Sequence, residues 1–124
     1  MSVGLVIFAH GSSISSANEA VEEVARAAAE AGGYLVHVGF LDPVHPTLDE
    51  AAAKLVEQGA DRILVVPYFL TLGLHLQRDL PVIVDRIAKR HPEVEFRVTP
   101  PLDGHAALLR IVLDRTVDAL QDWP

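Results

Sequence analysis

The chain alternates four times between a short apolar run and a helix-like segment, and this order restricts the folds open to it. Apolar runs of about four to eight residues that end in turn residues are typical of strands buried on both faces of a sheet. The expected strands cover residues 3–9, 34–41, 63–66 and 94–99. Because strands that alternate with helices are joined by right-handed crossovers, the sequence predicts an α/β fold. Its core would be a single open parallel four-stranded sheet with helices on both faces.

Capping residues indicate where the first two helices begin. Thr47, with Glu50 three residues later, forms a capping-box pattern for the second helix. Ser15 or Ser16, with Glu19 downstream, predicts a similar start for the first helix.

The last two helices have different signals. Pro81 predicts the first turn of a helix that ends at Arg90, because proline is favoured at the first helical position. The final helix is expected over residues 106–121. Its apolar positions belong either to the core or to an interface, and they are Leu108, Leu109, Val112 and Leu113.

Length and composition exclude several classes of function. A chain of 124 residues is expected to form one domain over residues 1–124. The net charge of −7 argues against nucleic-acid binding, which requires a basic surface. The absence of cysteine leaves no disulfide, thiolate ligand or thiol nucleophile. No apolar run is long enough for a bilayer, and no signal peptide is evident, so a cytoplasmic protein without membrane partners is expected.

Histidines follow all four expected strands. They are His10, His45, His75 and His105. In a parallel sheet these positions share the carboxyl edge, where open α/β sheets bind ligands, and Asp42 and Asp103 join them there. Imidazole and carboxylate groups suit Co²⁺, Fe²⁺, Ni²⁺ or Zn²⁺, and they also serve as general bases. The alternative is that each histidine only caps a helix or faces solvent, and the spacing by itself is not a metal-binding motif.

Two loops at this edge have unusual compositions. Residues 68–73, Y-F-L-T-L-G, are apolar although they follow a strand, so the loop either packs on the protein or lines a pocket. His75 follows it, and Asp79 would share a helical face with His75 if the chain is already helical there. The turn Gly11-Ser12-Ser13 could hold an anion on backbone N–H groups. It lacks the lysine of a nucleotide-binding loop, and no organic cofactor is expected.

Three stretches together resemble the small CbiX/SirB family. They read F-A-H-G-S-S, F-L-D-P-V-H-P-T-L-D-E-A and V-V-P-Y-F-L-T-L-G-L-H-L-Q-R-D-L-P, and the similarity covers nearly the whole chain. The resemblance implies a chelatase-like (flavodoxin-like) half-unit. It also implies a class II chelatase that inserts Co²⁺ or Fe²⁺ into sirohydrochlorin, in cobalamin or siroheme biosynthesis. The divalent metal, which could also be Ni²⁺, would be a substrate.

The resemblance also implies roles for particular residues. His10 and His75 would bind the metal and act in catalysis, with Asp42 as an acidic third ligand where a glutamate is usual. His45 in the same loop could replace Asp42. Residues of the two loops would contact the tetrapyrrole, and they are Gly11, Ser12, Ser13, Tyr68, Phe69, Leu70, Thr71 and Gly73. A homodimer would complete the cleft.

Two other functions remain open on sequence grounds. The same scaffold could serve as a non-catalytic carrier of a metal or a tetrapyrrole. Alternatively, the histidines at the strand ends could be incidental in a small α/β domain.

Overall fold

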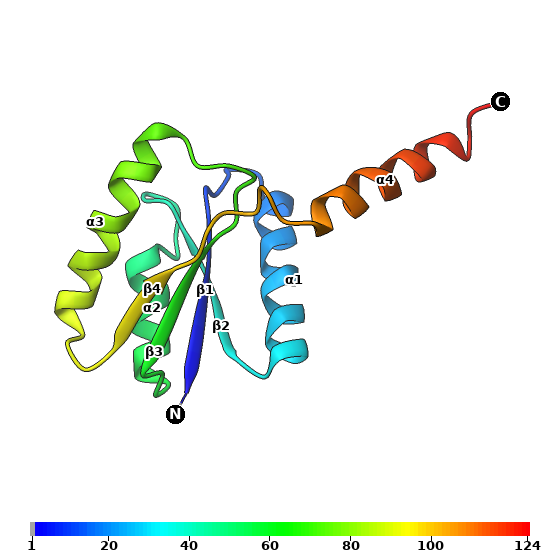
Figure 1. The fold of residues 1–124 in the computed structure, drawn as a ribbon. Coiled ribbons are helices and arrows are strands. Elements are labelled where there is room, and N and C mark those ends of the chain that lie inside the picture. Colours follow the sequence, from blue (N-terminus) through cyan, green and yellow to red (C-terminus); the bar gives the residue numbers. More distant parts are fainter. Residues whose placement is uncertain (1) are drawn as a thin grey trace.

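The computed structural model describes residues 2–124 and contains the expected parallel sheet (Figure 1). Its strands are β1 (Val3–Ala9), β2 (Leu35–Phe40), β3 (Arg62–Pro67) and β4 (Glu95–Val98). They are arranged in the order β2-β1-β3-β4, and each neighbouring pair is parallel. The sheet prediction is therefore confirmed, with strand ends that differ from the expected ones by one residue at most.

Helices cover both faces of the sheet (Figure 1). They are α1 (Ser15–Gly32), α2 (Leu48–Glu57), α3 (Leu74–Arg90) and α4 (Ala107–Leu120). One apolar cluster joins α1 to one face of the sheet, and a larger one joins α2 and α3 to the other. The alternation along β1 separates the two clusters, since Val6 and Phe8 point toward α2 and α3 whereas Ile7 and Ala9 point toward α1.

The start of α2 agrees with the sequence pattern. The Thr47 side chain accepts a hydrogen bond from the backbone N–H of Glu50 at 3.2 Å. The Glu50 carboxylate in turn accepts one from the backbone N–H of Thr47 at 2.8 Å. The predicted capping box is thus confirmed, and it fixes the end of the loop that carries Asp42 and His45.

The start of α1 differs from the sequence prediction. Neither Ser15 nor Ser16 caps this helix, because the N-cap residue is Ile14, which makes no side-chain capping bond. Asn18 organises the turn instead. Its side-chain oxygen accepts from the backbone N–H of Ser12 at 3.0 Å, and its side-chain nitrogen donates to the Ser12 carbonyl at 2.9 Å. The predicted serine cap was wrong because a longer side chain one turn into the helix reaches back to the loop.

The third helix begins at Leu74, seven residues before Pro81. The sequence prediction placed Pro81 in the first turn, but it lies inside the helix. Gly73 is the N-cap, and its carbonyl accepts from the backbone N–H of Gln77 at 3.0 Å. The Gln77 side chain also donates to the Leu72 carbonyl at 2.9 Å. His75 therefore lies in the first turn of a helix, four residues before Asp79 on the same face.

The last helix projects away from the rest of the molecule (Figure 1). It contains no buried residue, which excludes the core alternative for its apolar positions, whereas the interface alternative stays a prediction. Leu109 is 65% exposed, Val112 61% and Leu113 51%, whereas Leu108 is half-buried. No helix in residues 2–124 combines the length and apolar character needed to cross a bilayer.

Candidate functional site

The topology places His10 between two other loops at the carboxyl edge of the sheet. The strand before it, β1, lies between β2 and β3. Hydrogen bonds continue beyond the strands, from Leu41 N–H to the Ala9 carbonyl at 3.0 Å and from Tyr68 N–H to the Phe8 carbonyl at 2.7 Å. The helix after β1 lies on one face of the sheet, and the helix after β3 lies on the other face. The point between β1 and β3 is therefore a topological switch point, where open α/β sheets bind ligands.

Gly11 holds the His10 loop against the loop that follows β2. Its φ of 83° lies in the left-handed region, which side chains other than glycine rarely adopt. A Cβ atom at this position would lie 2.9 Å from the side chain of Val44, which is too close for any other residue. The glycine therefore permits the close contact that brings His10 beside the segment carrying Asp42.

The two predicted catalytic histidines are exposed and have different hydrogen-bonding partners. In His10, Nδ1 lies 3.0 Å from the carbonyl of Gly11, which only accepts. Its proton is therefore on Nδ1, and the lone pair of Nε2 is free for a metal ion or a proton. In His75, Nδ1 lies 3.4 Å from the guanidinium of Arg78, which only donates. His75 must give up this weak contact before Nδ1 can accept anything else.

The predicted metal ligands share one edge of the sheet without forming a closed site within one chain. Among residues 2–124, no three His, Asp or Glu side chains are close enough together to hold a metal ion. His10 follows β1, Asp42 follows β2, and His75 begins α3. The assignment of these residues as metal ligands stays a prediction.

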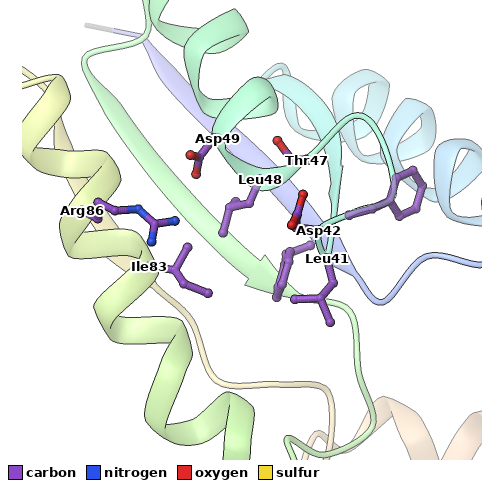
Figure 2. Close-up of a pocket in the computed structure, with 9 residues that line it drawn as sticks. Leu41, Asp42, Thr47, Leu48, Asp49, Ile83 and Arg86 are labelled. Carbon is purple, nitrogen blue, oxygen red and sulfur yellow. The ribbon is translucent and has the colours of Figure 1, made fainter.

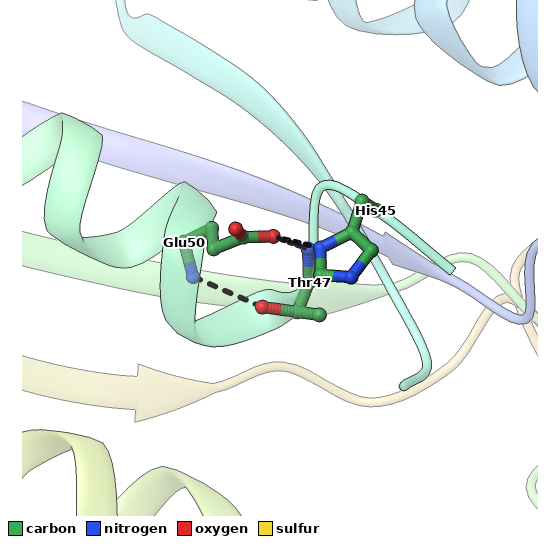
Figure 3. A network of polar contacts seen from close by, with 3 residues as sticks. All are labelled: His45, Thr47 and Glu50. Atoms are coloured by element: carbon green, nitrogen blue, oxygen red, sulfur yellow. Dashed lines mark hydrogen bonds and ion pairs between the residues drawn. The ribbon is translucent and has the colours of Figure 1, made fainter. Parts of the chain in front are cut away.

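His45 forms a hydrogen bond with Glu50, the third helical residue of α2 and a member of its capping box (Figure 3). Its Nδ1 lies 2.6 Å from the carboxylate of Glu50. This hydrogen bond, together with the negative charge of Glu50, raises the pKa of His45. The backbone N–H of Thr47, followed by the His45 contact, lowers the pKa of Glu50. The pair leaves Nε2 of His45 free, so Glu50 would orient this ring if it served as the third metal ligand.

Replacing Glu50 with glutamine should lower the pKa of His45 toward its ordinary value, because an amide carries no negative charge. In the wild type, the His45 contribution to stability is lost as pH rises through its raised pKa, and the Glu50 contribution is lost as pH falls through its lowered pKa. The pair therefore stabilises the fold most between about pH 4.5 and pH 6.5. A pH titration of the His45 ring signals by NMR in both proteins measures the shift, and an unchanged midpoint in the variant would contradict it.

A cavity of about 300 Å³ lies below this edge of the sheet, between α2 and α3 (Figure 2). Its apolar walls are formed by Phe8, Phe40, Leu41, Leu48 and Ile83. Its polar groups are Asp42, Thr47, Asp49 and Arg86. Figure 2 shows the Arg86 guanidinium reaching from α3 toward this cavity, across from Asp42. Sequence reasoning identified Asp42 but missed Arg86, which belongs to no motif and lines the cavity only through the packing of α3 beside α2.

Arg86 differs from the arginines near it. Arg78 forms an ion pair with Asp79, and Arg90 lies 3.2 Å from the Asp49 carboxylate. The ion pairs within residues 2–124 do not include Arg86. It is therefore a cation available to an anionic ligand that enters the cavity.

The apolar loop after β3 is divided between the core and the surface. Phe69 is half-buried, and its ring lies 5.8 Å from that of Phe8. Leu70 is 65% exposed and Tyr68 is at the margin of exposure. The sequence predicted that this loop either packs on the protein or lines a pocket. One part of the loop packs on the protein, and the other part presents an apolar surface at the edge of the sheet.

The turn after His10 has fewer free N–H groups than the sequence suggested. The backbone N–H of Ser12 donates to Asn18, and that of Ile14 donates to the Ser12 hydroxyl at 3.0 Å. These two N–H groups stabilise the turn and are therefore not free to bind an anion.

Three other histidines have structural roles. The Nε2 atom of His37, inside β2, forms a hydrogen bond of 2.9 Å with the Gln58 side chain. Nδ1 of His105 accepts from the Ala107 N–H at 3.0 Å, which caps the start of α4. His91 is the C-cap of α3, at the opposite end of the sheet.

An open parallel sheet with imidazole and carboxylate groups at its carboxyl edge defines an α/β domain of the class that binds ligands at a topological switch point. Within that class, the chain belongs to the CbiX family, because the model of this family matches residues 4–119.

Similar proteins include chains of equal and of double length. A sirohydrochlorin cobaltochelatase of Sulfolobus acidocaldarius is 33% identical over 122 residues, which cover 95% of this chain and 93% of that one. The chloroplastic sirohydrochlorin ferrochelatase of Arabidopsis thaliana is 34% identical over 90% of this chain, which spans only 50% of the plant protein. The structure of SirB from Bacillus subtilis with Fe³⁺ superimposes with a TM-score of 0.85 at 25% identity, covering 96% of this chain and 48% of SirB.

Proposed function

We propose that the protein is a chelatase that inserts Co²⁺ or Fe²⁺ into sirohydrochlorin, in cobalamin or siroheme biosynthesis. The observation that carries this proposal is the position of His10 at the switch point of a CbiX-family sheet. The relatives named as cobaltochelatase and ferrochelatase support the substrate and the reaction type.

The reaction exchanges two pyrrole N–H protons of the macrocycle for one divalent ion. It therefore needs an ion held with open coordination positions and groups that accept protons. Nε2 of His10 has a free lone pair for either role, and His75 gains one when it releases Arg78. Asp42, or His45 oriented by Glu50, would supply the third ligand. A carboxylate in this place also offsets the charge of the ion.

The surroundings suit a large polycarboxylate. The exposed part of the loop after β3, Tyr68 and Leu70, offers an apolar surface for the face of the macrocycle. The cavity of about 300 Å³ is too small for a whole tetrapyrrole but accepts one of its carboxylate arms. Arg86 would bind that arm, which counters the unfavourable net charge of −7 for an anionic substrate.

Replacing Arg86 with glutamine should therefore raise the KM for sirohydrochlorin about 10-fold or more and change kcat little, since a hydrogen bond to a charged group contributes about 1.5–3 kcal/mol. Steady-state kinetics at several sirohydrochlorin concentrations measures this. Lys89→Gln is the matched control, because it removes one positive charge from the same helix at a position that does not line the cavity. Equal effects of the two substitutions would show that only net charge matters.

We also propose that the working form is a homodimer. His10 and His75 are exposed, and residues 2–124 do not form a closed metal site by themselves. The similarity to proteins of about twice this length is consistent with a cleft built from two copies.

The test is an absorbance time course of sirohydrochlorin with Co²⁺, Fe²⁺ or Ni²⁺, with and without the protein. Acceleration over the metal-only control would establish the chelatase and rank the metals. A shifted spectrum without acceleration would instead indicate a carrier, and no change of any kind would indicate that the histidines are incidental.

A further inference from the structure

Three side chains near the start of α3 are linked by direct contacts, and Arg78 lies between the other two. Its Nε donates to the Asp79 carboxylate at 3.1 Å, and its Nη2 lies 3.4 Å from Nδ1 of His75. The hydrogen bonds within residues 2–124 give neither Asp79 nor His75 another side-chain partner. The hydrogen bonding of the His75 ring therefore depends on the residues one helical turn after it.

The contact with Arg78 determines which nitrogen of His75 carries the proton. A guanidinium only donates hydrogen bonds, so Nδ1 of His75 faces it without a proton. In a neutral ring the proton is then on Nε2, and that atom has no lone pair for a metal ion. His10 has the opposite arrangement, because its Nδ1 donates to the Gly11 carbonyl and its Nε2 is free. In this structure His75 is thus in the tautomer that cannot bind an ion through Nε2.

Helix geometry gives His75 a second neighbour that could replace Arg78. Residues three and four positions apart lie on the same helical face, with Cβ atoms about 5–6 Å from each other. Arg78 and Asp79 occupy these two positions after His75, and side chains in a helix lean toward its N-terminus, in the direction of His75. A carboxylate that accepts a hydrogen bond from Nδ1 leaves Nε2 free, as carboxylates do for metal-binding histidines. Asp79 is the carboxylate placed for this contact.

The present contacts of Arg78 are weak enough to be exchanged. The Arg78 side chain is 71% exposed and that of Asp79 is 51% exposed, and ion pairs in such positions contribute little to stability. Arg78 donates to Asp79 through Nε alone. A carboxylate of a ligand can accept from two guanidinium nitrogens at once, which is a stronger arrangement. The tetrapyrrole substrate proposed above carries such carboxylates, and its binding to Arg78 would release both His75 and Asp79.

We propose that Arg78 and Asp79 form a switch for the tautomer of His75, in which Asp79 is the positioning residue. Without substrate, Arg78 keeps the His75 proton on Nε2. When a carboxylate of the tetrapyrrole binds Arg78, Asp79 accepts a hydrogen bond from Nδ1, and Nε2 offers its lone pair to the ion. The ring stays neutral, because Nε2 gives one proton to water and Nδ1 takes one from water. The inference rests on the proposed function for the identity of the ligand that moves Arg78.

The switch makes metal binding at His75 depend on the tetrapyrrole. In the free protein the Arg78 guanidinium also repels a divalent ion from the ring next to it. Exposed imidazoles bind many divalent transition metals, so a ligand that was always available would also bind ions that are not substrates. With the switch, His75 becomes a ligand only when the macrocycle that receives the ion is present.

Nitrogen NMR of the His75 ring tests the switch directly, because the chemical shifts of the ring nitrogens show which one carries the proton. At a pH where the ring is neutral, the metal-free wild type should carry the proton on Nε2. Arg78→Met removes the donor, so its His75 should carry the proton on Nδ1. The wild type with metal-free sirohydrochlorin should show the same change, whereas Asp79→Ala should keep the proton on Nε2 in both conditions.

Co²⁺ binding without tetrapyrrole, measured by equilibrium dialysis, gives a second result. Arg78→Met should bind Co²⁺ more tightly than the wild type. Adding Asp79→Ala to Arg78→Met should lower the affinity by about 10- to 100-fold, the usual effect of removing a carboxylate that orients a metal-binding histidine. Adding Asp85→Ala instead is the matched control, since it removes an exposed carboxylate of the same helix about 15 Å from His75 and should change the affinity little.

Two outcomes would overturn the switch. One is an unchanged His75 tautomer in Arg78→Met, and the other is an equal loss of Co²⁺ affinity from Asp79→Ala and Asp85→Ala. The comparison of the wild type with Arg78→Met uses neither metal nor tetrapyrrole, so it tests the switch even if the protein is not a chelatase. Metal insertion by a protein whose His75 tautomer does not respond would support the proposed function and overturn the switch alone.

Discussion

Replacing His75 with alanine should lower the rate of metal insertion into sirohydrochlorin by about 10²- to 10⁴-fold. A positioned proton acceptor contributes a factor of this size, and His75 would also lose its role as a metal ligand. The same result is expected for His10→Ala, whose ring is held in the tautomer with a free Nε2 by the Gly11 carbonyl. The absorbance time course with Co²⁺ measures both rates.

His91→Ala is the matched control for these substitutions. His91 ends α3 at the opposite end of the sheet, and the centroid of its ring lies 6.3 Å from that of Phe96 in a tilted arrangement. Its removal should leave the insertion rate within about twofold, and thermal unfolding should show that all three variants remain folded. Full activity of either His10→Ala or His75→Ala would contradict the proposed roles, and equal losses in all three variants would point to a general structural effect.

The sheet and its functional edge could be predicted because they depend on simple patterns. Each buried strand is a continuous apolar run, and alternation with helices implies parallel order. Once that order is known, His10, Asp42 and His75 must follow strands at the same edge. The capping box at Thr47 could also be predicted, because its hydrogen bonds connect two residues only three positions apart.

The start of α3 could not be read from local signals. Proline is common in a first turn, which made Pro81 a misleading marker, whereas the true N-cap Gly73 makes no side-chain capping bond. Residues 74–80 begin the helix because Leu76 and Leu80 pack on the core formed with α2. This tertiary contact decides where the helix begins.

The position of α4 also could not be predicted from sequence patterns. A helix with apolar residues at regular spacing has the same pattern whether it covers its own sheet or that of a partner. The structure excludes the core alternative, since Leu109, Val112 and Leu113 are exposed, and the interface alternative stays a prediction. The roles of His10, Asp42 and His75 as ligands and the cytoplasmic location stay predictions.

Replacing Phe8 with alanine should lower the free energy of unfolding by about 3–5 kcal/mol, the usual range for a buried phenylalanine. Phe8 is 1% exposed and belongs to the larger core cluster between the sheet, α2 and α3. Domains of this kind are stabilised by only about 5–15 kcal/mol in total, so this one change can consume much of the stability. Urea unfolding followed by circular dichroism measures the difference.

Phe8→Leu separates the loss of packing from the loss of an aromatic ring, since leucine keeps most of the apolar volume and should cost clearly less stability. Phe8 also supports the site, because its side chain forms a wall of the cavity and its ring contacts Phe69 in the loop after β3. Phe8→Leu should therefore remain folded yet bind sirohydrochlorin more weakly, since Phe69 loses its partner. A loss of stability below about 1 kcal/mol for Phe8→Ala would contradict the burial of this residue. An unchanged KM in Phe8→Leu would show that the contact between Phe8 and the loop after β3 does not affect substrate binding.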